Sequence, residues 1–365
     1  MADTTDPLRS PEIPRARLAT LPTPLEGGLA LGAQGSGVAA AASSSDRPTL
    51  WVKRDDLTGL GGGGNKARKL EFLCGQALAD GARALVTVGA AQSNHCRMTA
   101  AAAARLGLEA HLVLSGDEPV EPVGNQLLDR LFGAQCHFTG AAESHWGELE
   151  IAREQLTESL AAEGLAPASI PIGGSTPAGA AGYAVAFVEL VDQFRAAGVG
   201  VTPQAIVFTS SSGGTHAGLL AGRAAMLASG ELSAADAPDV VAIGVAKGVV
   251  LGHPDIASLA NDTLDLLGIG PSSAGGVSVD PGDVELDDRW LGEDYAIPTE
   301  AGDRAVRWAA ERGGWLLDRT YSGKGLSGLL GIAAEGRWAS DEHVVFVHTG
   351  GWPALFAVDG VPDGP

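Results

Sequence analysis

Cysteine is scarce in this chain, and long apolar runs are missing. The 365 residues include three cysteines, Cys74, Cys96 and Cys136, with no CxxC spacing. This odd number excludes a disulfide framework and indicates no zinc site, so we expect buried thiols and no bound metal. No apolar run reaches the roughly 18 to 20 residues of a membrane helix, and the first residues show no secretion signal. We therefore expect a cytoplasmic protein without a membrane partner.

Positive charge is scarce as well. The chain has 24 Lys and Arg against 44 Asp and Glu, which gives a formal net charge of −20. A strongly negative surface repels the phosphates of nucleic acids and of acidic membranes, so neither is an expected partner. Glycine, by contrast, is abundant at 52 residues, alongside 45% hydrophobic residues. This composition and length are typical of a soluble α/β enzyme with many tight turns and two domains.

From residue 83 onward, short β-rich segments alternate with helical ones, which is the pattern of a mostly parallel sheet flanked by helices. The expected strands are 84–88, 110–114, 169–172, 205–208, 240–245 and 343–347. The expected helices are 96–106, 124–132, 179–195, 216–228, 299–312 and 325–334. Two stretches rich in small residues, 35–46 and 268–283, are expected to be surface loops, the first of them a loose insertion.

A glycine-rich loop carries a single lysine. Residues 61–64 are four glycines, and Asn65, Lys66 and an amphipathic segment that ends near Gly81 follow. Because glycine has no Cβ, a ligand can approach the backbone here. We expect Lys66 in the first turn of a helix, where the helix dipole disfavours the ammonium slightly and burial would lower its pKa further. A free amine in this place suits a nucleophile, and a solvated lysine on a flexible loop is the alternative.

A second loop joins the expected strand 205–208 to a helix and is rich in hydroxyls and glycines. Such a loop directs backbone N–H groups and hydroxyls toward one point at a helix N-terminus, which favours an anion such as phosphate. The sequence has no GxxxxGK[ST] motif and no clean GxGxxG after a strand, so ATP and NAD are weak candidates. A plain Ser-Gly turn is the alternative. The anion-binding candidates are Ser210, Ser211, Ser212, Gly213, Gly214 and Thr215.

Two further loops follow expected strands. Ser93, Asn94 and His95 precede an alanine-rich helix, where side chains and N–H groups suit a carboxylate or a phenolic oxygen. Ordinary helix capping by Ser93 or Asn94 is the alternative. Thr349 follows the strand 343–347, at the sheet edge where ligands gather in open α/β folds. A lysine, a phosphate loop and carboxylate donors together describe a site for pyridoxal 5′-phosphate.

These motifs resemble those of a known family. They run from Leu21-Pro22-Thr23-Pro24-Leu25 through Trp51-Val52-Lys53-Arg54-Asp55-Asp56 to residues 349–356, Thr-Gly-Gly-Trp-Pro-Ala-Leu-Phe. The chain is similar to the D-cysteine desulfhydrase and 1-aminocyclopropane-1-carboxylate deaminase family, within the fold type II (tryptophan-synthase-β-like) pyridoxal phosphate enzymes. The resemblance implies an α/β fold with two open, mostly parallel sheets flanked by helices. It also implies a homodimer, and a small domain, residues 67–178, inserted in a large one, residues 1–66 and 179–365.

The resemblance assigns roles to the candidates. Lys66 would be the Schiff-base lysine, and Asn94 would bond the phenolic oxygen of the cofactor. Ser93 would contact the substrate carboxylate, and the loop from Ser210 to Thr215 would bind the phosphate. The other residues implied on the substrate side or around the ring are His95, Tyr295, Tyr321, Ser322 and Thr349.

Two positions distinguish the branches of this family. The deaminases resemble Tyr-Glu-Gly-Lys and His-Leu-Gly-Gly, whereas this chain has Ser322 and Thr349 in the place of Glu and Leu, as in the desulfhydrase pattern. A hydroxyl at Thr349 cannot protonate the pyridine nitrogen as a carboxylic acid could, which favours prompt β-elimination. His95 also resembles that branch, because the deaminases tend to carry glutamine there. We therefore expect a lyase that converts D-cysteine to pyruvate, sulfide and ammonia.

Other functions stay open at this point. The chain departs from the family pattern in its N-terminal insertion, at Ser211 and in the irregular stretch 248–294. L-cysteate or another β-substituted alanine is therefore an alternative substrate, and 1-aminocyclopropane-1-carboxylate deamination is an alternative activity. A non-catalytic sensor of a phosphate ligand is the alternative of another class, although a sensor would not need Lys66 together with Ser93 and Thr349.

Overall fold

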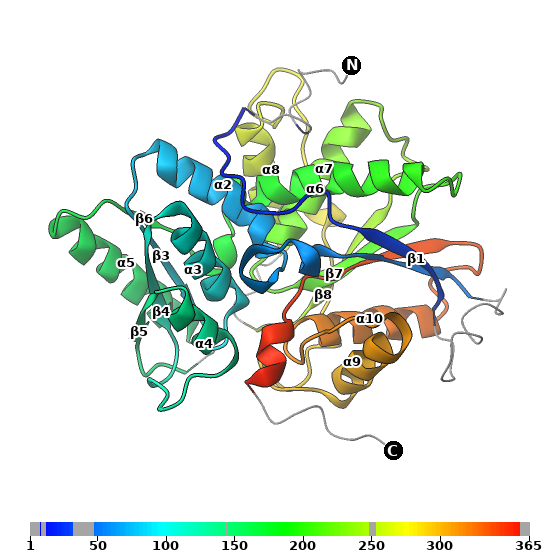
Figure 1. Cartoon of the computed structure of the whole chain (residues 1–365). Coiled ribbons are helices and arrows are strands. Elements are labelled where there is room, and N and C mark those ends of the chain that lie inside the picture. The colour runs from blue at the N-terminus through cyan, green and yellow to red at the C-terminus, as the bar shows by residue number, and fades with distance from the viewer. Residues whose placement is uncertain (1–7, 9–11, 32–46, 143–144, 248–252, 358–365) are drawn as a thin grey trace.

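The protein contains two open β-sheets with helices on both faces of each (Figure 1). The computed structural model describes residues 8, 12–31, 47–142, 145–247 and 253–357. The predicted insertion at 35–46 lies outside these residues. Within the described ranges, no helix is long and apolar enough to cross a membrane. The two mostly parallel sheets confirm the predicted fold class, and the domain boundaries at 66 and 178 stay a prediction.

The larger sheet has six strands in the order β1-β2-β10-β7-β8-β9. Its only antiparallel pair among the described strands is β1 with β2. Helices α6, α7 and α8 cover one face, and α9 and α10 cover the other (Figure 1). The strands are β1 (Leu25–Ala30), β2 (Thr49–Lys53), β7 (Ala205–Ser210), β8 (Asp239–Gly244), β9 (Glu285–Asp287) and β10 (His343–Val347). The helices are α6 (Pro177–Ala196), α7 (Gly214–Ala228), α8 (His253–Leu266), α9 (Glu300–Gly313) and α10 (Ser322–Ala334).

The smaller sheet has four parallel strands in the order β5-β4-β3-β6. Helices α2 and α3 share a core with one face of this sheet, and α5 packs on the other. The strands are β3 (Ala84–Gly89), β4 (Glu109–Leu114), β5 (Gln135–Phe138) and β6 (Pro167–Ser169). The helices are α2 (Lys66–Ala79), α3 (Asn94–Leu106), α4 (Gly124–Leu131) and α5 (Trp146–Ala162). Short 3-10 turns are η1 (Asp55–Leu57), η2 (Leu60–Gly62), η3 (Ile172–Gly174), η4 (Pro281–Asp283) and η5 (Trp352–Phe356).

The continuous apolar runs of the central strands follow from burial on both faces. Along β7, Ile206 and Phe208 pack under α6 and α7, whereas Ala205 and Val207 face the core beneath α9 and α10. Successive side chains of a strand point to opposite faces, so a strand covered on both sides needs apolar residues at every position. The polar residues predicted to form the site lie instead in the loops that leave the carboxyl ends of β3, β7 and β10.

Two sequence predictions need correction. The expected strand 169–172 is wrong beyond its first residue, because β6 ends at Ser169 and Ile172 begins the turn η3. Pro171 has no N–H for a ladder, and Gly173 adopts a φ of 64°. The stretch 248–294 is not irregular throughout, since α8 and β9 lie within it. The sequence reasoning also missed the elements β1, β2, β5 and α5.

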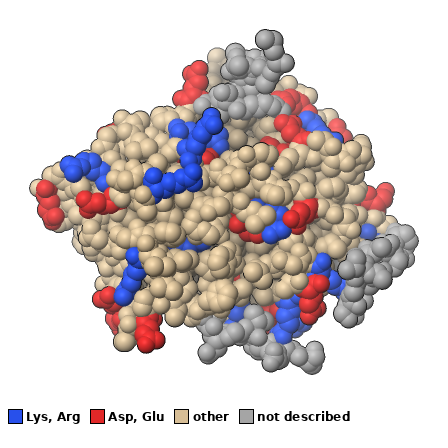
Figure 2. Space-filling view, viewed as in Figure 1, with Lys and Arg blue, Asp and Glu red and all other residues tan. Residues whose placement is uncertain are grey.

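One face of the molecule carries few charged side chains. Figure 2 shows a face on which Lys, Arg, Asp and Glu side chains are sparse over a broad central area. Because the formal net charge is −20, the low charge density of this face is a distinct feature of the molecule.

Candidate active site

A single pocket collects most of the predicted site residues. Its lining combines aromatic rings with hydroxyl, amide and amine groups, a composition that is usual for small-molecule sites. The pocket lies between the loops of the two sheets. The predicted residues that line it are Lys66, Ser93, Asn94, His95, Ser210, Ser211, Ser212, Gly213, Thr215, Tyr295, Tyr321 and Thr349. Gly214 and Ser322 are absent from this lining.

Lys66 is the first residue of α2, directly after the four glycines. All four glycines have positive φ, and a Cβ at Gly63 would lie 1.8 Å from the carbonyl oxygen of Asp56. Only glycine fits this turn, which delivers Lys66 into the pocket. The Nζ lies 3.4 Å from Asn65 Oδ1, and burial lowers the pKa of Lys66 to about 8. About a tenth of this side chain is therefore free amine at pH 7, far more than for a lysine in water.

The glycine turn is held by a buried arginine. Arg97, on α3, donates through its guanidinium to the carbonyl oxygens of Gly61 and Gly63, at 2.5 and 3.0 Å. Burial lowers the pKa of Arg97 to about 10, and the Asp129 carboxylate opposes this effect. The backbone N–H of Asn65 also donates to the carbonyl of Thr349, at 3.0 Å. The lysine is thus fixed from both sheets.

The loop after β7 has the properties of an anion site. It leads into the N-terminus of α7, and Gly213 adopts a φ of 84° that turns the backbone. The Ser210 hydroxyl is buried and has no hydrogen-bond partner within the described part of the chain. A buried hydroxyl without a partner costs free energy unless a ligand bonds it, so the loop suits a bound phosphate.

Sequence reasoning missed Lys69, which lies beside this loop. Its Nζ is buried and donates to the carbonyl oxygen of Gly173 at 3.1 Å. A Cβ built on Gly214 would be only 2.8 Å from this nitrogen. Burial, together with the positive charge of Lys66, holds the pKa of Lys69 well below its usual range. The spacing predicts this position, because residues three apart on a helix share a face and Lys69 follows Lys66 by three.

The loop after β3 supplies a polar wall. The Ser93 Oγ accepts from Cys96 N at 3.2 Å, so this side chain caps α3 and also lines the pocket. Thr87 donates its hydroxyl to a backbone carbonyl, so it accepts from His95 Nε2 at 2.8 Å. The buried Nδ1 of His95 is then an acceptor. Burial, with Lys66 and Lys69 nearby, keeps the pKa of His95 well below its usual range, so the ring is neutral.

Two tyrosines face each other across the substrate side of the pocket. The hydroxyls of Tyr295 and Tyr321 are hydrogen-bonded to one another. Trp146 packs edge-on against Tyr295, with ring centroids 5.0 Å apart. Lys324 donates to the carbonyl oxygens of Leu291 and Asp294, at 2.7 and 3.2 Å, and so fixes the segment that leads into Tyr295.

Ser322 lies behind the pocket wall. Its hydroxyl donates to Asp318 Oδ1 at 2.6 Å and accepts from Asp318 N at 2.9 Å. This bonding uses the one hydroxyl proton of Ser322 and one of its two lone pairs, and the predicted role of Ser322 at the cofactor stays a prediction. Thr349 does line the pocket.

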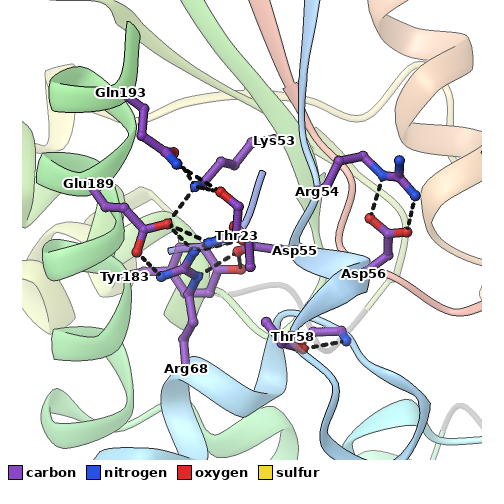
Figure 3. A network of polar contacts seen from close by, with 11 residues as sticks. Thr23, Lys53, Arg54, Asp55, Asp56, Thr58, Arg68, Tyr183, Glu189 and Gln193 are labelled. Atoms are coloured by element: carbon purple, nitrogen blue, oxygen red, sulfur yellow. Dashed lines mark hydrogen bonds and ion pairs between the residues drawn. The ribbon is translucent and has the colours of Figure 1, made fainter. Parts of the chain in front are cut away.

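A buried ionic network lies next to α2, away from the pocket (Figure 3). Arg68 donates to both carboxylate oxygens of Asp55 at 2.8 Å and also pairs with Glu189. Tyr183 donates to Asp55 at 2.6 Å, and Lys53 pairs with Glu189. Burial alone would raise the pKa of Asp55, but Arg68, Lys53 and Tyr183 together outweigh burial and lower the pKa. The network joins β2, α2 and α6, and it lies two residues beyond Lys66.

Comparison with known proteins decides the family. A family model described as "Pyridoxal-phosphate dependent enzyme" matches residues 26–350. The chain belongs to this family. It is 37% identical to a D-cysteine desulfhydrase of Serratia proteamaculans over 315 residues, which cover 84% of this chain and 88% of the relative. A D-cysteine desulfhydrase of Salmonella typhi is also 37% identical, over 317 residues.

Solved structures agree with this membership. A structure described as an ACC deaminase homologue has a TM-score of 0.79 and 34% identity, covering 98% of this chain and 97% of the other. An O-ureido-L-serine synthase has a TM-score of 0.60 at 17% identity, covering 96% and 95%, which shows the fold alone. The predicted cofactor, pyridoxal phosphate, is confirmed by the family. The residues present fit it, because one pocket is lined by a lysine amine and by a loop at a helix N-terminus whose buried Ser210 hydroxyl has no partner among the described residues.

Proposed function

We propose that the protein is a β-eliminating lyase that converts D-cysteine and water to pyruvate, sulfide and ammonia. The main support is the pocket lining: it contains the Lys66 amine, a tyrosine pair and Thr349, and no carboxylate from the described part of the chain. Similarity to D-cysteine desulfhydrases over most of the chain supports the same substrate. A pocket wall without a carboxylic acid suits elimination, since no strong proton donor faces the cofactor ring.

The cofactor would be held at both ends. Lys66 would bind its aldehyde carbon covalently, and Asn94 would donate to its phenolic oxygen. Ser210 to Thr215 at the α7 N-terminus would hold the phosphate, with the Lys69 ammonium compensating its charge. When bound, pyridoxal phosphate withdraws electrons from the α-carbon of an amino acid.

The chain's own groups would then move the protons. The Lys66 amine, with a pKa of about 8, is placed to accept the α-proton of the substrate. Ser93, at the α3 N-terminus, would hold the substrate carboxylate. The hydrogen-bonded hydroxyls of Tyr295 and Tyr321 would donate a proton to the departing sulfur. Neutral His95 adds no positive charge to this wall.

A product assay tests the function. Purified enzyme loaded with pyridoxal phosphate is given D-cysteine, L-cysteine, L-cysteate or 1-aminocyclopropane-1-carboxylate, and pyruvate, 2-oxobutyrate and sulfide are measured. We expect sulfide and pyruvate in equal amounts from D-cysteine. Faster ring opening of the cyclopropane substrate than sulfide release from either cysteine would contradict the proposal.

We also infer a homodimer. The sparsely charged face in Figure 2 supports association with a second copy, because two strongly acidic faces would repel each other. The neighbouring elements α4 and η5 add exposed apolar side chains, among them Leu127, Leu131 and Phe356. The mass in solution, measured by light scattering, would equal that of two chains, and a monomer across micromolar concentrations would refute the inference.

A further inference from the structure

Helix α4 buries polar residues and exposes apolar ones, which is the reverse of a usual surface helix. Its polar residues Asn125, Gln126 and Asp129 are buried, whereas Leu127 and Leu131 are 44% and 70% exposed. A surface helix normally turns its apolar side toward the core. Two of the three buried polar residues, Asn125 and Gln126, bond Gln92 in the loop after β3.

Asn125 binds this loop at three points. Its backbone N–H donates to Gln92 Oε1 at 2.8 Å, and its Nδ2 donates to the Gln92 carbonyl oxygen at 2.7 Å. The same Nδ2 donates to Asn94 Oδ1 at 2.9 Å. Both hydrogens of the Asn125 amide are thus used, and the side chain is fully buried.

These contacts determine which way the Asn94 amide points. A backbone carbonyl can only accept, so Gln92 requires the NH₂ group of Asn125 on that side. Because this one nitrogen also faces Asn94, Asn94 must present its Oδ1 to Asn125. A reversed Asn94 amide would place two NH₂ groups against each other. The remaining branch of Asn94, its Nδ2, has no hydrogen-bond partner among the described residues, and Asn94 lines the pocket.

We propose that Asn125 is a positioning residue that fixes Asn94 as a hydrogen-bond donor into the pocket. The inference rests on the proposed role of Asn94 at the phenolic oxygen of pyridoxal phosphate. That oxygen carries negative charge when deprotonated, so a donor stabilises it and an acceptor repels it. Asn125 touches neither cofactor nor substrate, and it acts by excluding the unfavourable amide orientation.

Cofactor affinity and colour test this role without substrate. Asn125→Ala is compared with wild type, with Asn94→Ala and with the double variant, each as apo-protein titrated with pyridoxal phosphate. Protein fluorescence gives the Kd, and the visible band of the lysine-bound cofactor reports the charge of its ring oxygen. Gln126→Ala is the matched control, because Gln126 is buried on the same helix and accepts from Gln92 Nε2 at 3.3 Å but does not contact Asn94.

We expect Asn125→Ala to weaken cofactor binding about tenfold and to shift the visible band in the same direction as Asn94→Ala. The double variant should bind the cofactor as tightly as Asn94→Ala alone, since both changes remove the same interaction, that of Asn94 with the cofactor. Gln126→Ala should leave the band in place. If Asn125→Ala does not fold, Asn125→Asp replaces it, because a carboxylate has the same shape but cannot donate to Asn94.

The results separate this inference from the lyase proposal. An unshifted band in Asn125→Ala, or a full additional loss in the double variant, would overturn the positioning role. So would an Asn94→Ala variant with unchanged colour. An enzyme that shows the expected band shifts but releases no sulfide from D-cysteine would refute the lyase activity and leave the role of Asn125 supported.

Discussion

Neighbouring residues of α2 belong to two opposite electrostatic environments. Arg68 is buried in the ionic network of Figure 3, where burial alone would lower its pKa but Asp55 and Glu189 raise it well above the usual range. Lys69 is equally buried, lies beside the loop after β7 and has one hydrogen-bond partner among the described residues, the Gly173 carbonyl oxygen. A buried charge is tolerated when it is paired, and an unpaired one is costly. The contrast supports a structural role for the network. It also supports the proposal that Lys69 pairs with the negative charge of a bound phosphate.

The largest effect should come from the pocket side. Lys66→Ala should lower turnover by about three orders of magnitude or more and remove the visible band of the bound cofactor, because the amine proposed to bind the aldehyde is lost. The far-ultraviolet circular dichroism should not change. A retained band in the pure variant would show that another lysine, such as Lys69 or Lys324, carries the cofactor.

On the network side, Asp55→Asn should reduce the free energy of unfolding by roughly 3 to 5 kcal/mol, because Arg68 loses the carboxylate that holds it. Urea denaturation of the apo-protein measures this. Glu118→Gln is the control, since the exposed Arg130–Glu118 pair should contribute under about 1 kcal/mol. Equal effects of the two changes would contradict the structural role given to the network.

Lys69→Met should sharpen the contrast by acting in opposite directions on stability and binding. Affinity for pyridoxal phosphate should fall about 100-fold, whereas affinity for pyridoxal, which lacks the phosphate, should barely change. The apo-protein should become more stable. The pKa of Lys69 is lower in the folded state than in the unfolded state. Below about pH 10 the unfolded state therefore binds a proton that the folded state does not, and the free energy of unfolding falls. Methionine binds no proton, so the variant lacks this loss. A matched loss of affinity for both cofactor forms would place Lys69 away from the phosphate.

The smallest predicted effect is a pH dependence of cofactor capture. With a pKa of about 8, Lys66 is mostly protonated at pH 7 and mostly free amine at pH 9. The rate at which apo-protein binds pyridoxal phosphate covalently should therefore rise about tenfold over this interval, with its midpoint near pH 8. Stopped-flow absorbance follows it. A midpoint above pH 10 would show that Lys66 is not desolvated.

Local patterns predicted the parts of the site that depend on neighbouring residues in the sequence. The glycine turn, Lys66 at the start of a helix and the hydroxyl-rich loop after β7 all follow from loop chemistry. Lys69 could have been found from its spacing. The contact of Asn125 with Asn94 could not, because it depends on how α4 is rotated, and amphipathicity predicts the opposite rotation.

The same limit explains the errors in the fold. Residues 253–266 form α8 within a stretch that the sequence predicts to be irregular. The prediction is wrong because it gives the surrounding Gly, Pro and Ser residues more weight than the helical spacing of this segment. The role of Ser322 at the cofactor stays a prediction from the motif around it, and in the folded chain its hydroxyl bonds Asp318. A sequence motif predicts which segment of the chain lies near a site. The packing of the backbone then determines which side chain of that segment faces the ligand.

The bond from Asn65 N–H to the Thr349 carbonyl gives α2 a mechanical role. It ties the first turn of this helix to the loop after β10 in the larger sheet, while the rest of α2 shares a core with the smaller sheet. Lys66 therefore lies where the two sheets are joined. If Lys66 holds the cofactor as proposed, changes that shift one sheet against the other would act on cofactor binding before they act on any other step.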